Sequence, residues 1–131
     1  MGAWGYRTFE DDTSCDWIGE FKARPGRERL KTALEAVLRA DDIDDLLGSA
    51  ALAAAEVVAA LAGKPSDLLP GEVGRWVGGQ TPADPALRQK ATEAVARVFQ
   101  ASELRETWAD AGGSGLREWQ QALDELKSRL A

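Results

Sequence analysis

Acidic side chains are the groups in this sequence whose type and position best suggest chemistry. The 131 residues include no histidine, which excludes Ser-His and Cys-His nucleophiles and His-ligated metals. The single cysteine, Cys15, stands among acids that raise a thiol pKa, so we do not expect a reactive nucleophile there. Attention therefore falls on Glu56, the one charged residue in the stretch from Leu46 to Gly63.

Glu56 needs a partner from another part of the chain if this stretch is a buried helix. Its helical neighbours are apolar or glycine, so none of them can neutralise it. An unpaired buried carboxylate costs several kcal/mol, and its pKa rises instead. The favoured interpretation is a polar clamp that joins the helix to the segment around Trp4 and Gly5. The candidate partners are Arg7, Lys22, Arg75, Arg97, the tryptophan indole N–H groups and backbone amides of the N-terminal loop.

A catalytic role for Glu56 is the alternative interpretation. It could act as a general acid or base with Asp11, Asp12 or Asp16 as the second carboxylate, with or without a divalent metal. Two acids in a helical protein are a weak signal, and a Glu56 that simply reaches solvent is a third option. The acidic run Asp41–Asp45 lacks the spacing of a calcium loop and is typical of acids that complement a helix N-terminus. We predict no bound metal and no cofactor.

Hydrophobic periodicity predicts an all-α, single-domain bundle of six or seven helices over residues 1–131. The Ala-rich stretch Leu46–Gly63 is predicted to be its central helix, and it is too short and too weakly apolar to span a bilayer. The other expected helices run from Asp12, Thr13 or Ser14 to about Ala23, from Pro25 through Leu38, over Pro70–Val77, from Pro85 through Phe99, from Ser102 to the glycines at 112–113, and over Leu116–Leu130.

The two ends of the chain carry the remaining apolar signals. Residues 1–10 have no helical period but include three aromatic residues, so we expect this irregular segment to lie on the bundle with Trp4 in the core. Residues Leu116, Trp119, Leu123, Leu126 and Leu130 alternate steps of three and four. This pattern predicts a helix that docks on its own domain, and a weak homodimer through the same helix is the alternative.

The charge of the chain bears on its partners. A net charge of −6 and a pI near 4.7 disfavour nucleic acid and anionic membrane surfaces, but they favour a basic protein partner. Residues 1–63 hold 7 basic and 12 acidic side chains, whereas residues 64–131 hold 9 and 10, so the acidity is concentrated in the first half. The lone cysteine and the absence of a signal-peptide pattern predict a cytoplasmic protein.

Several motifs resemble those of the DUF4259 family, a set of small uncharacterised proteins found mainly in bacteria. They are the opening MGAWG with FEDDTSCDW, the central AAAEVVAALAGKP, and the later SELRETW and REWQQALDELKSRL. The chain departs from the family pattern at Tyr6-Arg7-Thr8 and at Glu10-Asp11-Asp12. The resemblance implies no established activity, but it supports treating Trp4, Gly5, Asp12, Asp16, Trp17 and Glu56 as one constellation.

The sequence thus leaves two functional hypotheses. The favoured one is a non-enzymatic acidic protein-interaction module, such as an immunity-type inhibitor of a basic partner. The alternative is a carboxylate-based hydrolase that uses Glu56 with Asp11, Asp12 or Asp16.

Overall fold

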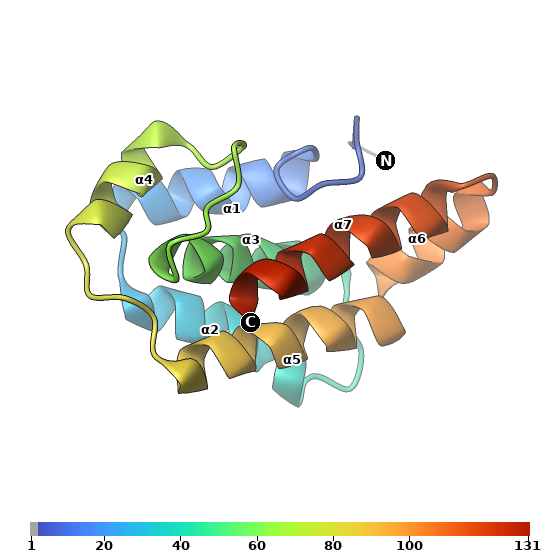
Figure 1. Cartoon of the computed structure of the whole chain (residues 1–131). Helices are drawn as coiled ribbons and strands as arrows, with labels where there is room; N and C mark the ends of the chain where they lie inside the picture. The colour runs from blue at the N-terminus through green and yellow to red at the C-terminus, as the bar shows by residue number, and fades with distance from the viewer. Residues whose placement is uncertain (1–2) are drawn as a thin grey trace.

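Seven helices account for most of residues 3–131, the part of the chain that the computed structural model describes (Figure 1). This part contains no strand, only one isolated antiparallel bridge between Ala3 and Asp11. The prediction of an all-α bundle is confirmed. The helices are α1 (Asp12–Ala23), α2 (Arg27–Arg39), α3 (Asp45–Leu61), α4 (Gly71–Gly78), α5 (Pro85–Gln100), α6 (Glu103–Ala111) and α7 (Gly115–Leu130).

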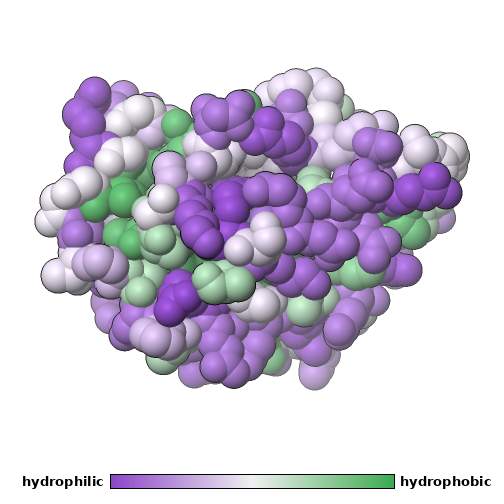
Figure 2. All heavy atoms as spheres, viewed as in Figure 1, coloured by the Kyte–Doolittle hydropathy of each residue, from purple (hydrophilic) through white to green (hydrophobic). Residues whose placement is uncertain are grey.

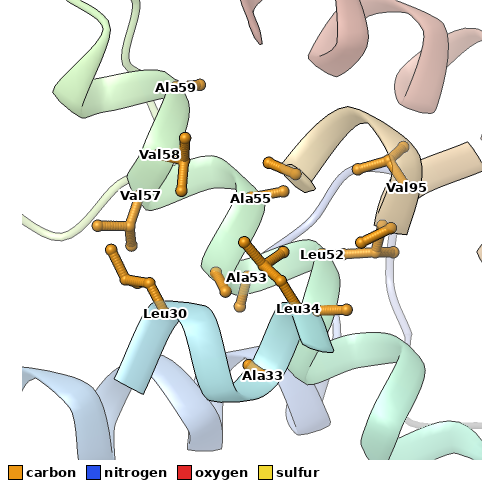
Figure 3. Packing of buried hydrophobic residues seen from close by; sticks show 14 of the residues in the cluster. Leu30, Ala33, Leu34, Leu52, Ala53, Ala55, Val57, Val58, Ala59 and Val95 are labelled. Carbon is orange, nitrogen blue, oxygen red and sulfur yellow. The ribbon is translucent and has the colours of Figure 1, made fainter. Parts of the chain in front are cut away.

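Helix α3 is the centre of the bundle, as its composition predicts. It contacts each of the six other helices, and every residue from 51 to 61 is buried. Its alanines let neighbouring helices approach closely, and larger side chains from those helices fill the remaining space. Figure 3 shows Leu34 of α2 beside Ala53 of α3 and Leu30 beside Val57, with Val95 of α5 in the same core.

Side-chain caps set most of the helix starts. Asp84 accepts a hydrogen bond from Leu87 N at 2.8 Å and is followed by Pro85, and Ser102 accepts one from Arg105 N at 3.1 Å. Both helices begin where the sequence predicts, α5 at Pro85 after Asp84 and α6 at its N-cap Ser102. At α1 the cap is Asp11, one residue before the earliest predicted candidate, and it accepts from Ser14 N at 2.9 Å. Helix α2 also begins later than expected, because Pro25 precedes the helix instead of opening it.

The N-terminal segment lies on the bundle, but the prediction that Trp4 enters the core is wrong. Trp4 is 64% exposed, and Phe9 is the aromatic residue of this segment that is buried. The backbone explains the difference: Trp4 N donates to Glu10 O at 2.9 Å, and Phe9 N donates to Ser14 Oγ at 2.9 Å. The loop is therefore pinned through Phe9 to the start of α1. Met1 and Gly2 lie outside the described residues.

Helix α7 docks on its own domain. Its predicted seam faces inward, with Trp119, Leu123, Leu126 and Leu130 buried against α3 and α5. The joint before it is a turn in which Gly112 and Gly113 have φ values of 75° and 61°. Figure 1 shows α7 crossing the front of the bundle, and Figure 2 shows mostly hydrophilic side chains on that outer face. Among residues 3–131, no helix combines the length and apolarity needed to cross a membrane.

Candidate functional site

Glu56 is buried, as predicted, but its partner is Arg129 in the last turn of α7. The two guanidinium nitrogens Nη1 and Nη2 donate to Oε1 and Oε2 of Glu56 at 2.8 and 3.0 Å. Arg129 also donates to Glu125 Oε2 at 2.6 Å and to Lys64 O at 3.3 Å. The predicted clamp to the N-terminal segment is therefore wrong in its partner. It joins the central helix to the C-terminal helix instead.

The electrostatics of this pair suit a structural connection. Burial raises the pKa of Glu56, and the hydrogen bonds from Arg129 only partly oppose that effect. For Arg129, burial lowers the pKa, but the hydrogen bonds to Glu56 and Glu125 outweigh it and the net shift is upward. Arg7 adds a weaker attraction to Glu56 from a neighbouring ion pair with Asp67. A carboxylate bound in this way through both oxygens is not free to exchange protons with a substrate.

A partly enclosed cavity lies away from Glu56, between the N-terminal segment, the starts of α1 and α3, and the α6–α7 pair. Its volume is about 250 Å³. In Figure 1 the N-terminal segment lies next to the start of α1, and α6 and α7 form a hairpin beyond it. The residues that line the cavity are Ala3, Gly5, Tyr6, Arg7, Thr8, Asp11, Asp12, Thr13, Ser14, Asp45, Ser49, Leu52, Leu104, Thr107, Trp108 and Trp119.

Carboxylates from two helix starts converge at this cavity. Asp11 and Asp12 come from the start of α1, and Asp45 comes from the first turn of α3. Burial raises the pKa of Asp45, and the nearby charges of Glu103, Asp11 and Asp44 raise it further. The Glu103 carboxylate accepts a hydrogen bond from Asp45 N at 2.8 Å, which fixes the start of α6 next to the start of α3. The cavity therefore lies in a field that favours cations.

Three buried polar side chains of the cavity lining have no hydrogen-bond partner among residues 3–131. Thr8, Ser49 and Trp119 are 8%, 3% and 3% exposed. None of the side-chain hydrogen bonds found within residues 3–131 involves their hydroxyl or indole N–H groups. In the same part of the chain, no fully enclosed side-chain nitrogen or oxygen lacks a partner, so these three groups keep contact with the cavity.

Large exposed apolar side chains gather in the segments that border the cavity. Among the described residues these are Trp4 and Tyr6 of the N-terminal segment and Leu46, which directly follows Asp45; they are 64%, 38% and 69% exposed. Tyr6 packs against Trp108 with ring centroids 5.0 Å apart. We define the cavity border as Trp4, Tyr6, Asp12, Asp45 and Leu46. It combines apolar surface with negative charge.

A family model described as a domain of unknown function (DUF4259) matches residues 2–122. The chain belongs to the DUF4259 family. The match includes every residue that lines the cavity of this DUF4259 protein, but it ends before Arg129, the partner of Glu56. No curated protein and no solved structure matches the chain.

In the structure of this DUF4259 chain, only some residues of the predicted constellation lie at the cavity. Gly5 and Asp12 line the cavity, and Trp4 lies beside Gly5 on the cavity border. A Cβ at Gly5 would lie 2.5 Å from Oε1 of Glu10, so a larger residue there would require the flexible Glu10 side chain to shift.

The other members of the constellation lie away from the cavity. Trp17 stacks on Phe21 at 5.3 Å, Asp16 is exposed on α1, and Glu56 pairs with Arg129. Within residues 3–131, no group of three or more His, Cys, Asp or Glu side chains is placed to hold a metal ion.

The buried polar groups of this cavity in the DUF4259 chain are not among the site residues predicted from the sequence. A signal for one of them was present: Ser49 and Glu56 are the only polar side chains between Leu46 and Gly63. Their spacing of seven residues places them on one face of α3, together with Asp45 and Leu52. The unpaired state of Thr8 and Trp119 had no such signal, since it depends on contacts between distant segments.

Proposed function

We propose that this protein is a non-enzymatic, acidic interaction module that binds a basic protein partner at the cavity border. One observation carries the proposal: the large apolar side chains exposed in residues 3–131 lie in the N-terminal segment, which leads into Asp12, and at Leu46, which follows Asp45. Isolated exposed apolar residues are ordinary, but a group of them next to charges is typical of an interaction surface.

The chemistry of the cavity border fits a basic partner. Trp4 and Tyr6 supply the aromatic area that often provides most of the binding energy in an interface. The carboxylates attract cationic groups over a distance and accelerate their association. Arginine suits both features, because its guanidinium stacks on aromatic rings and pairs with carboxylates. An immunity-type inhibitor of a basic protein in the cytoplasm is one form that such a module could take.

The position of Glu56 supports a binding role over the hydrolase alternative. A carboxylate-based hydrolase needs Glu56 beside a second acid, yet Glu56 is paired with Arg129 and does not line the cavity with Asp11 and Asp12. The burial of the α7 seam likewise favours a monomer over a homodimer through that helix. Light scattering of the purified chain tests this: a monomer mass supports it, and a dimer mass contradicts it.

Capture of proteins with the immobilised chain tests the proposed function. The bait is used as wild type, as Asp12→Asn and as the double variant Trp4→Ala/Leu46→Ala. The matched control is Asp124→Asn, which removes the same charge from an exposed position on α7 away from the cavity. Capture is compared at about 0.1 M and about 1 M salt, where the screening length falls from roughly 10 Å to 3 Å.

The expected result is a basic protein that the wild type and Asp124→Asn retain at low salt and release at high salt. The cavity-border variants should retain much less of it. Equal capture by the wild type and the double variant would contradict the proposal, as would capture of acidic proteins only.

A further inference from the structure

The geometry points to a more specific role for the cavity: we propose that it receives one arginine residue of the basic partner. The guanidinium faces the carboxylates of Asp12 and Asp45, and the carbonyl of the same residue accepts a hydrogen bond from the Trp119 indole. This inference rests on the proposed function, because it names the group by which the partner is recognised.

Charge is the first reason. Among residues 3–131, the lining includes three carboxylates and one cation, Arg7, whose guanidinium is already engaged by Ser66 and Asp67. Asp11 is partly satisfied, because its carboxylate accepts from Ser14. Asp45 has no such donor: within residues 3–131 its carboxylate makes no hydrogen bond or ion pair, and its neighbours Glu103, Asp11 and Asp44 repel it. A bound cation would counter the repulsion from these acids.

The unpaired polar groups are the second reason. Buried hydroxyl and indole N–H groups normally have hydrogen-bond partners, and Thr8, Ser49 and Trp119 have none among the described residues. The two hydroxyl oxygens can accept from a guanidinium. The indole N–H can only donate, so a ligand that replaces cavity water beside it needs an acceptor. A residue within a peptide has both a cationic side chain and a carbonyl, whereas a metal ion or a simple amine lacks the acceptor.

Size and shape are the third reason. The cavity of about 250 Å³ is slightly smaller than the roughly 300–1,000 Å³ of sites for drug-sized molecules, so it suits a single residue. The rings of Trp108 and Trp119 form part of its wall, and Tyr6 extends the aromatic surface outward. A planar guanidinium stacks on such rings more readily than a lysine ammonium does.

Calorimetric titration with defined probes tests the inference. The first probe is N-acetyl-argininamide, which has one guanidinium and carbonyl acceptors. n-Butylguanidine has the same charge but no carbonyl, and N-acetyl-lysinamide has the carbonyls but an ammonium. A tri-arginine peptide represents the partner. The protein variants are Ser49→Ala and Asp45→Asn, and their matched controls are the exposed positions Ser114→Ala and Asp124→Asn.

We expect N-acetyl-argininamide to bind more tightly than n-butylguanidine and more tightly than N-acetyl-lysinamide. Ser49→Ala and Asp45→Asn should each weaken it by about tenfold or more, while the two controls leave its Kd unchanged. The tri-arginine peptide should follow the same pattern. Circular dichroism melting establishes that each variant is folded, so a loss of binding reports on the cavity.

The other outcomes separate the two proposals. One outcome is that the wild type binds the peptide, that Trp4→Ala/Leu46→Ala does not, and that Ser49→Ala and Asp45→Asn bind it as well as the wild type does. In that case the cavity inference fails, and the cavity border still serves the proposed function. If n-butylguanidine binds as tightly as N-acetyl-argininamide, the role assigned to Trp119 is wrong. If the free arginine analogue binds far more tightly than the peptide, the cavity belongs to a small molecule and the inference is overturned.

Discussion

At the scale of single residues, two carboxylates of α3 have opposite electrostatic environments. Glu56 has a guanidinium within 3.0 Å of each oxygen and completes a contact between α3 and α7. Asp45 lines an open cavity, where burial and then the neighbouring acids raise the pKa of its carboxylate. The first carboxylate is paired within the fold, and the second is exposed and has no hydrogen-bond or ion-pair partner within residues 3–131. The candidate site is therefore placed at Asp45 and not at Glu56.

Removal of Arg129 should destabilise the fold strongly at neutral pH. Arg129→Met leaves the Glu56 carboxylate buried without its partner, which we expect to cost about 3 kcal/mol in the free energy of unfolding. The double variant Arg129→Met/Glu56→Leu should recover most of the loss, because both charges are then gone. Urea unfolding of the two variants and the wild type measures this. A single variant as stable as the wild type would contradict the clamp.

The loss in Arg129→Met should depend on pH in a defined direction. Burial raises the pKa of Glu56 above its ordinary 4.5, and loss of Arg129 raises it further. Above pH 4.5 the carboxyl group is ionised in the unfolded chain but resists ionisation in the folded chain. A raised pKa in the folded chain therefore destabilises the fold in this pH range. The gap between Arg129→Met and wild type should therefore shrink as the pH falls below that value. Unfolding at pH 7 and at pH 4 provides the comparison.

Asp45→Asn should stabilise the protein while it weakens binding. Burial and neighbouring acids raise the pKa of Asp45 above 3.8, so its ionisation costs stability at higher pH. The amide removes that cost, and the variant should melt at a higher temperature than the wild type at pH 7 but not at pH 3. Such a gain in stability at the expense of function is typical of binding sites. A lower melting temperature at pH 7 would show that the Asp45 charge is satisfied within the fold.

The two wrong predictions about single residues, the partner of Glu56 and the position of Trp4, have a common physical origin. Arg129 lies 73 residues from Glu56, and the candidate partners considered from the sequence did not include it. A weak signal existed, because Arg129 stands between the seam positions Leu126 and Leu130 and so near the inner side of α7. Trp4 was misplaced for a related reason: aromatic content indicates that a segment packs on the bundle, but not which ring enters the core. The loop hydrogen bonds place Phe9 there.

At the scale of elements, the sequence predicts most of the fold because the helix signals are local. Asp84 and Ser102 mark helix starts through hydrogen bonds from backbone N–H groups three residues on, and Pro85 marks one through its fixed φ. Gly63, at φ 86°, ends α3 in a conformation that side chains resist. The cavity is different, since it forms where the starts of α1, α3 and α6 meet. No local pattern encodes that meeting.

Two glycine substitutions should have opposite effects on stability. Gly63→Ala places a Cβ on a left-handed residue and should cost roughly 1 kcal/mol, although nothing lies within 4 Å of the added atom. Gly19→Ala is the matched control, because Gly19 lies inside α1 with equally open space. It should stabilise the protein by about 0.5–1 kcal/mol. Urea unfolding of both variants checks this, and the same sign for both would contradict the assigned backbone conformations.

At the scale of the whole molecule, one face of α3 serves both stability and the candidate site. Asp45, Ser49 and Leu52 line the cavity, and Glu56 continues the same face to the contact with Arg129. The C-terminal helix follows that face, with Trp119 at the cavity and Arg129 at the ion pair. The acidic first half of the sequence contributes Asp11, Asp12 and Asp45, so the charge asymmetry becomes a local feature of the cavity.

Chemical-shift mapping with the tri-arginine peptide is the most direct test of the central claim, that the functional surface is the cavity and its border. Backbone and indole amide signals of the labelled chain are followed as the peptide is added. The shifts should be concentrated in residues 3–14, 44–52 and 103–108 and in the Trp119 indole N–H. Shifts spread evenly over the acidic surface, or centred on Arg129 and Glu125, would contradict the claim.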